Sequence, residues 1–304
     1  MSGSHAHGNG ITSKKMWIAT AITFTFCLFE ALIGYQSNSL ALMADAGHNF
    51  ADALALALSA FALWMATKKA DDKRTFGYHR VGILAALVNA VGLVVMAVVI
   101  FWEAVQRLQA PESVDSGPMI WVALGAIVLN TSIAWWLSAA AKDDLNIRSA
   151  YLHMLGDAAA SLGVVIAGII IVFTSWYIAD PIVSIIFALL VLWSSWSILT
   201  ESIQMLLEGT PVGLNLANVK QKITEVQGVL NVHDLHVWAV SSGLTACNCH
   251  ILIADQNVSA GQKIQQNVTH MLEHDFNINH STIQIEVVDC GDHDHAAKSH
   301  HDHA

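Results

Sequence analysis

The stretch ALMADAGHNFADALALALSAFALWMA, residues 41–66, decides the fold of this 304-residue chain. It is longer than the roughly 20 apolar helical residues that cross a bilayer core, yet it contains His48 and Asp52. A second apolar stretch repeats this spacing with His153 and Asp157. Positions i and i+4 share one face of a helix. Two such helices side by side would therefore direct two imidazoles and two carboxylates to one point, and a tetrahedral Zn²⁺ takes four ligands.

The composition indicates a membrane domain followed by a soluble one. The chain is 54% hydrophobic and 12% charged, with a mean hydropathy of +0.50, whereas soluble domains carry about 25% charged residues. We expect a His-containing cytoplasmic tail over 1–15, a transmembrane domain over 16–205, a cytoplasmic domain over 209–290, and a disordered His/Asp-rich tail over 291–304. The net charge of −10 without a basic patch argues against a nucleic-acid partner.

Six apolar stretches are predicted to form transmembrane helices, over residues 16–36, 41–66, 80–108, 118–141, 149–174 and 180–205. Basic residues lie before the first helix and in the second and fourth links, whereas Arg107 is the one basic residue near an outside link. The positive-inside rule then places both termini in the cytoplasm. The helices that carry His48 and His153 are therefore antiparallel, and this arrangement allows both His-Asp pairs a shared depth near the bilayer midplane.

The soluble part shows the pattern αββαβ. Helical spacing covers residues 216–226 and 259–274, and strand patterns cover 232–240, 244–253 and 282–288. This order predicts a three-stranded sheet with two helices on one face. Cys247 and Cys249 would point the same way on a strand and could meet a metal. No spaced disulfide framework is present, which fits a reducing cytoplasm.

Ionisable residues inside a bilayer usually have a function, because an Asp at the helix centre costs about 2.5–3.5 kcal/mol on insertion scales. A lone His or Asp could simply hydrogen-bond a neighbouring helix, but two His-Asp pairs at identical spacing favour a metal site. Asp45 lies one turn before His48, where it could support a ligand, carry a proton or line the mouth of the site. The acids in or near the other spans are interpreted as solvated or capping; these are Glu30, Glu103, Asp180 and Glu201.

The chain resembles the cation diffusion facilitators, a family of zinc/proton antiporters. The matching pieces are residues 39–52, Thr75-Phe-Gly-Tyr-His-Arg80, residues 146–157, Leu207-Glu-Gly-Thr-Pro211 and His233-Asp-Leu-His-Val-Trp238, within about residues 14–290. The resemblance implies a six-helix bundle with a cytoplasmic αββαβ domain that binds metal and supports a homodimer. It also implies that the transport site is formed by His48, Asp52, His153 and Asp157. Some relatives with Asp at the position of His48 accept cadmium as readily as zinc.

The resemblance also implies metal ligands in the cytoplasm. His233 and His250 match ligands on adjacent strands, His280 and Glu286 match a pattern at the last strand, and His79 matches a position between the two domains of animal zinc transporters. Strand alternation predicts that His236 faces away from His233. Zn²⁺ is then a regulatory ligand as well as the substrate, and no prosthetic cofactor is expected.

We therefore expect a divalent cation exporter, and not an enzyme, that exchanges cytoplasmic Zn²⁺ for H⁺ by alternating access. Two imidazoles and two carboxylates suit Zn²⁺ better than Mg²⁺, Ca²⁺ or Mn²⁺. The sequence does not distinguish Zn²⁺ from Cd²⁺, Co²⁺ and Ni²⁺ as substrates. The expected location is the bacterial cytoplasmic membrane. The alternative is a membrane metal sensor, or a metal-binding protein without flux. No Walker-type phosphate loop or His-Glu-x-x-His motif supports a pump or a protease.

Overall fold

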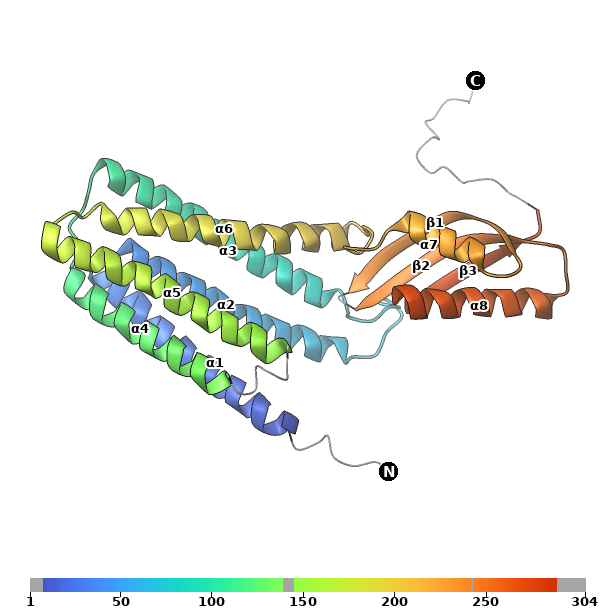
Figure 1. Cartoon of the computed structure of the whole chain (residues 1–304), viewed down its shortest axis with the longest axis horizontal. Coiled ribbons are helices and arrows are strands. Elements are labelled where there is room, and N and C mark those ends of the chain that lie inside the picture. Colours follow the sequence, from blue (N-terminus) through green and yellow to red (C-terminus); the bar gives the residue numbers. More distant parts are fainter. Residues whose placement is uncertain (1–7, 139–144, 242, 289–304) are drawn as a thin grey trace, which may run out of the picture. The chain divides into compact units, whose positions relative to one another are not determined.

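The computed structural model of the chain describes residues 8–138, 145–241 and 243–288 (Figure 1). The chain divides into two compact units, residues 1–61 with 85–199, and residues 62–84 with 200–304. The predicted tail over 291–304 and the first seven residues lie outside the described residues. Each unit is described by itself below.

The first unit is built from helices. In chain order these are α1 Gly8–Gln36, α2 Leu40–Ala66, α3 Val81–Gln109, α4 Ser116–Leu137, α5 Leu145–Thr174 and α6 Ala179–Leu206. Among the described residues, α2 to α6 each contain a stretch long and apolar enough to cross a bilayer, and Ala21–Gln36 of α1 is a shorter apolar helical stretch. The prediction of six apolar helices is confirmed. The fourth helix ends at Leu137 and the fifth begins at Leu145, each about a turn earlier than predicted.

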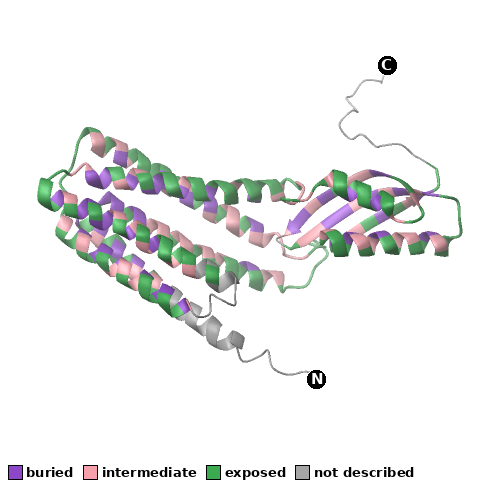
Figure 2. Cartoon of the chain, viewed as in Figure 1, coloured by how far each residue is buried: buried purple, intermediate pink, exposed green. Residues whose placement is uncertain are grey.

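Small side chains let these helices approach closely. Ala41 and Ala44 of α2 are buried, as are Ala97 of α3, Ala123 of α4 and Ala167 of α5. Helix α4 packs along α5, and α1 packs against α4. Figure 2 shows buried residues facing the interior of the bundle and exposed ones along its outside. Large apolar side chains make up much of that exposed surface, as expected of helices that face lipid.

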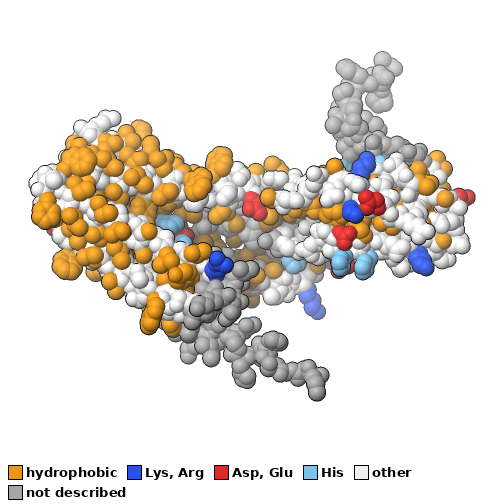
Figure 3. Space-filling view, in the orientation of Figure 1, with side chains coloured by type: hydrophobic (Ala, Val, Ile, Leu, Met, Phe, Trp, Pro, Cys, Tyr) orange, Lys and Arg blue, Asp and Glu red, His pale blue; other side chains and the backbone are white. Residues whose placement is uncertain are grey.

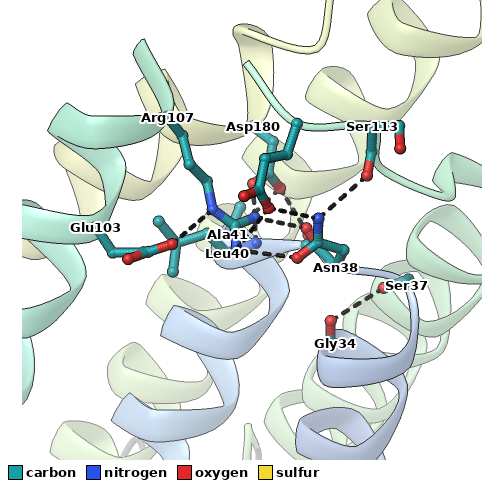
Figure 4. A network of polar contacts seen from close by, with 11 residues as sticks. Gly34, Ser37, Asn38, Leu40, Ala41, Glu103, Arg107, Ser113 and Asp180 are labelled. Carbon is teal, nitrogen blue, oxygen red and sulfur yellow. Dashed lines mark hydrogen bonds and ion pairs between the residues drawn. The ribbon is translucent and has the colours of Figure 1, made fainter. Parts of the chain in front are cut away.

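The start of α2 is capped by a residue from α6 (Figure 4). Asp180 is fully buried and its carboxylate accepts hydrogen bonds from the Ser39 hydroxyl at 2.6 Å, the Leu40 amide at 2.8 Å and the Ala41 amide at 3.2 Å. The first amides of a helix have no partner within the helix and favour a negative charge. The interpretation of Asp180 as a capping residue is therefore correct, although it caps another helix and not its own.

Arg107 of α3 joins the same network. Its guanidinium donates to the Asn38 carbonyl at 2.8 Å, to Asn38 Oδ1 at 3.0 Å and to Glu103 at 3.0 Å. Asn38 has φ of +55°, in the left-handed region that asparagine tolerates at helix ends. The one basic residue near an outside link is thus bound by acceptors of the short α1–α2 connection, which explains this exception to the charge pattern.

The second unit contains the αββαβ domain, and that prediction is confirmed. Its elements are α7 Leu216–Glu225, β1 Val229–Ser241, β2 Leu244–Ile253, α8 Val258–Phe276 and β3 His280–Glu286. The sheet order is β1-β2-β3, with β1 and β2 antiparallel and β2 and β3 parallel. Asn215 caps the start of α7, Asn257 caps α8, and Asn277 with φ of +54° ends α8.

One face of this sheet packs on both helices. The core joins Val219 of α7 and Val268 of α8 to Val232, Cys249 and Ile283 of the three strands. Cys249 lies opposite Ile283 in the register, and Val232 lies opposite Ile251, two residues further along β2. Partners across a ladder and residues two apart on a strand share a face. The three strands therefore point these side chains to the helices and the intervening ones to the opposite face.

Candidate metal sites

The structure brings together the four residues predicted for the membrane site. His48 and Asp52 are one turn apart on α2, and His153 and Asp157 are one turn apart on α5. His48 Nε2 lies 3.5 Å from Asp52 Oδ2 and 3.9 Å from Asp157 Oδ1. His153 Nε2 lies 3.2 Å from Asp52 Oδ2 and 3.6 Å from Asp157 Oδ2. Each imidazole therefore approaches a carboxylate of both helices.

These side chains differ in their access to solvent. The Asp157 side chain is 5% exposed, whereas that of His153 is 42% exposed. The residues of α2 before His48 are mostly buried, whereas most of those after Asp52 are not. On α5 the described residues before Asp157 are not buried, whereas Ser161, Val164 and Val165 after it are. Because the two helices are antiparallel, both patterns describe one end of the bundle as closely packed and the other as open. Figure 3 shows histidine and acidic surface together among the apolar side chains of the helices.

Two further carboxyl groups lie on the closed side of these residues. Asp45 of α2 and Glu30 of α1 are both fully buried. The Ser161 hydroxyl of α5 donates to Asp45 Oδ2 at 2.8 Å and contacts the Asp157 carbonyl at 3.0 Å. Asn49 donates to Glu30 Oε2 at 3.3 Å. The interpretation of Glu30 as a solvated or capping acid is wrong, because the residue lies in the helix interface with a polar partner on α2.

A second group of candidate ligands lies on the sheet face away from the helices. His233 of β1, His250 of β2 and Glu286 of β3 offer one ligand atom each, all within 4.8 Å of one another, and all three are buried. His233 Nε2 lies 3.2 Å from Glu286 Oε2, and His250 Nδ1 lies 3.0 Å from Glu286 Oε1. Two imidazoles and a carboxylate at these distances could hold a metal ion such as Zn²⁺.

A β-bulge shapes this site and corrects one expectation. His233 pairs with His250 and His236 pairs with Asn248, so three steps on β1 match two steps on β2. His236 is therefore on the same face as His233, contrary to the alternation that we expected. Asp234 lies within the bulge with φ of +51°. Its carboxylate contacts His236 Nε2 at 2.8 Å and lies 3.7 Å from His250 Nε2.

The remaining predicted ligands lie elsewhere. His280, at the start of β3, is exposed and is not part of the His233, His250 and Glu286 group. Its ring meets Phe76 edge to face, with centroids 5.3 Å apart. His280 and His79 line one cavity of about 490 Å³ in the second unit. The structure thus brings these two histidines to a common cavity, separate from the sheet site.

The cysteines of β2 do not join either group. Cys247 and Cys249 are buried in the core on the helix side of the sheet, so they point away from His250. A hydrogen bond from Cys247 and burial raise the pKa of the Cys249 thiol well above its usual range. A metal binds the thiolate and not the thiol, which argues against the expectation that this pair meets a metal.

Six apolar helices with four convergent His and Asp side chains, joined to a small αββαβ domain, define an integral multi-pass membrane protein that handles metal ions. Residues 16–207 match the family model for the cation efflux transmembrane domain, and residues 211–288 match that for the cytoplasmic domain of cation efflux proteins. The chain belongs to the cation diffusion facilitator, or cation efflux, family. It is a transporter and not an enzyme.

Bacterial relatives match nearly the whole chain. The cadmium, cobalt and zinc/H(+)-K(+) antiporter of Bacillus subtilis is 38% identical over 96% of this chain and 94% of its own length. The zinc transporter ZitB of Escherichia coli is 37% identical over 95% of this chain and 94% of its own length. The metal-bound C-terminal domain of the CzcD transporter from Cuprividus metallidurans is 35% identical over 24% of this chain and all of that domain, with a TM-score of 0.23.

Proposed function

We propose that this protein exports divalent metal ions, foremost Zn²⁺, from the cytoplasm in exchange for protons. The observation that carries the proposal is the convergence of His48, Asp52, His153 and Asp157 between α2 and α5. Relatives with 37–38% identity are a cadmium, cobalt and zinc antiporter and a zinc transporter. Two imidazoles and two carboxylates suit Zn²⁺. Cd²⁺, Co²⁺ and Ni²⁺ are the competing substrates.

The chemistry of these ligands links metal to protons. A metal binds neutral imidazole and ionised carboxylate, so its binding releases protons, and its affinity falls as the pH falls. His153 is 42% exposed while Asp157 is buried, so a metal ion would enter from the open end of the bundle. A site that opens alternately to each side would exchange Zn²⁺ for H⁺.

The direction follows from the orientation of the chain. The α2–α3 link carries Lys68, Lys69, Lys73 and Arg74, so we place this link and both termini in the cytoplasm. The open end of the bundle is then the cytoplasmic one. We place the protein in the bacterial cytoplasmic membrane, where the inward proton gradient would drive metal outward.

We further propose that His233, His250 and Glu286 bind a regulatory metal ion, and that the protein works as a homodimer. These three residues lie on the sheet face that carries no helix. Metal there would reduce the repulsion between two acidic domains. His79 and His280 form a second, separate candidate pair in their shared cavity. The transport site and the regulatory site are therefore distinct in this proposal.

The test is metal uptake by inside-out vesicles under an imposed proton gradient, with Zn²⁺, Cd²⁺, Co²⁺ and Ni²⁺ compared. Uptake that follows the gradient and disappears when it is collapsed is the expected result. Metal binding without uptake would favour the alternative, a membrane metal sensor. Uptake that is independent of the proton gradient would indicate a channel.

A further inference from the structure

A buried pair of carboxyl groups lies beside the proposed transport site. Glu30 of α1 and Asp45 of α2 are both 0% exposed, and Asn49, one turn after Asp45 on α2, donates to Glu30, so both carboxyl groups lie at the same contact between α1 and α2. Ionised carboxylates are hydrogen-bond acceptors only, so two of them side by side repel each other and neither can donate to the other.

The hydrogen bonds of the pair show where a donor is missing. Asn49 donates to Glu30 Oε2 and Ser161 donates to Asp45 Oδ2, so each group has one oxygen with a donor. The second oxygen of each, Glu30 Oε1 and Asp45 Oδ1, meets no donor among the described residues. A buried acceptor without a donor is costly. One proton shared by the pair supplies the missing donor and removes one of two buried negative charges.

Asp180 provides a contrast within the same bundle. It is equally buried, but its carboxylate accepts from one hydroxyl and two backbone amides. Three donors stabilise the ionised form of a carboxyl group. Burial alone therefore does not require a proton; two neighbouring carboxyl groups that each have one oxygen without a donor favour one.

We propose that Glu30 and Asp45 together hold one proton that the transported metal ion displaces. Asp45 lies three residues before His48, about 4.5 Å along the helix axis, and Ser161 connects it to the Asp157 backbone. A dication at the four ligands favours two ionised carboxylates nearby. On metal binding the proton leaves the pair for water on the open side, and on metal release a proton from the opposite side replaces it.

The surrounding titratable groups belong to three helices. They are the Cys27 thiol on α1, His48 and Asp52 on α2, and Asp157 on α5. His48, Asp52 and Asp157 belong to the proposed ligand set and exchange protons on their own account. The proton of the Glu30–Asp45 pair is additional to theirs. This inference rests on the proposed function but assigns the coupling proton to residues outside the four ligands.

The experiment compares the full-length protein with the variants Glu30→Gln and Asp45→Asn. Calorimetric zinc titrations in buffers of different ionisation enthalpy count the protons released per zinc ion. Each variant should release about one proton fewer than the parent, and contributions from other zinc sites cancel in the comparison. The control is Asp180→Asn, which changes an equally buried carboxyl outside the Glu30–Asp45 pair and should leave the count unchanged.

Infrared difference spectra of the parent, with and without zinc, give a readout that needs no variant. The C=O stretch of a protonated carboxylic acid should disappear on zinc binding. Absence of this change in the parent, or unchanged proton counts in both carboxyl variants, would overturn the shared proton while leaving zinc transport intact. If the parent protein binds no zinc at the membrane site, the proposed function would be overturned instead.

Discussion

The substitution Asp180→Ala should strongly destabilise the helical bundle. It removes the acceptor of three hydrogen bonds, from the Ser39 hydroxyl and from the Leu40 and Ala41 amides. All three donors are buried, so water cannot replace the carboxylate. A buried donor left without a partner costs about 1–3 kcal/mol, and the lost charge at the helix start adds roughly 0.3–1 kcal/mol.

These terms share one helix turn and are not fully additive, so we expect a loss of about 3–5 kcal/mol in the free energy of unfolding. At about 2–4 °C per kcal/mol for a chain of this size, the melting temperature should fall by roughly 10 °C. Asp180→Asn keeps one carbonyl oxygen as an acceptor and should lose about half as much.

Thermal unfolding of the detergent-purified protein, followed by tryptophan fluorescence, provides the measurement. The control is Glu112→Gln in the same network. The Glu112 side chain is 54% exposed, and its carboxylate lies 3.6 Å from the Arg107 guanidinium. An exposed ion pair contributes about 0–1 kcal/mol, so this variant should melt close to the parent. Equal melting temperatures for Asp180→Ala and Glu112→Gln would refute the reasoning that the buried cap stabilises α2.

The remaining predictions concern metal. Asp157→Asn keeps the shape of the side chain but removes a charged ligand. Zinc flux into proteoliposomes should fall more than about 100-fold, because loss of a residue that only hydrogen-bonds a metal ligand already costs about 10–100-fold. The control is Asp115→Asn, at the exposed cap of α4. Near-normal flux would exclude Asp157 as a ligand. His48→Asp should shift the Zn²⁺/Cd²⁺ flux ratio toward Cd²⁺, as the family resemblance implies; an unchanged ratio would mean that other features set selectivity. His233→Ala with His250→Ala should weaken zinc binding by residues 209–288 in calorimetry and lower transport without abolishing it, whereas His270→Ala with His274→Ala, on the exposed face of α8, should not.

The helical periodicity of the sequence was sufficient to predict which four residues of the membrane domain meet. His48 and Asp52, like His153 and Asp157, share a helix face by spacing alone, and the cost of placing such residues in a bilayer directs them to the bundle interior. The αββαβ order was equally readable, because strand alternation and helix spacing differ clearly. The homologous relatives then agree with the class of transporter that these patterns predict.

Features that depend on contacts between distant helices or strands could not be predicted from the local sequence pattern. Glu30 lies on α1, and nothing in its own helix indicates that Asp45 and Asn49 of α2 face it. The bulge at Asp234 inserts one residue into β1, and strand alternation cannot anticipate the resulting change of face at His236. Asp180 was identified as a cap, but the helix that it caps begins far away in the sequence.

The capping of α2 by Asp180 also has a consequence for the order of assembly. The ribosome makes residues 40–66 of α2 well before residues 179–206 of α6. While α2 enters the membrane, the Leu40 and Ala41 amides lack the carboxylate that later binds them. The first turn of α2 therefore reaches its final state only after the last transmembrane helix has inserted. A nascent chain that ends before α6 should leave this turn frayed, and it would be recognisable to quality-control proteases as incomplete.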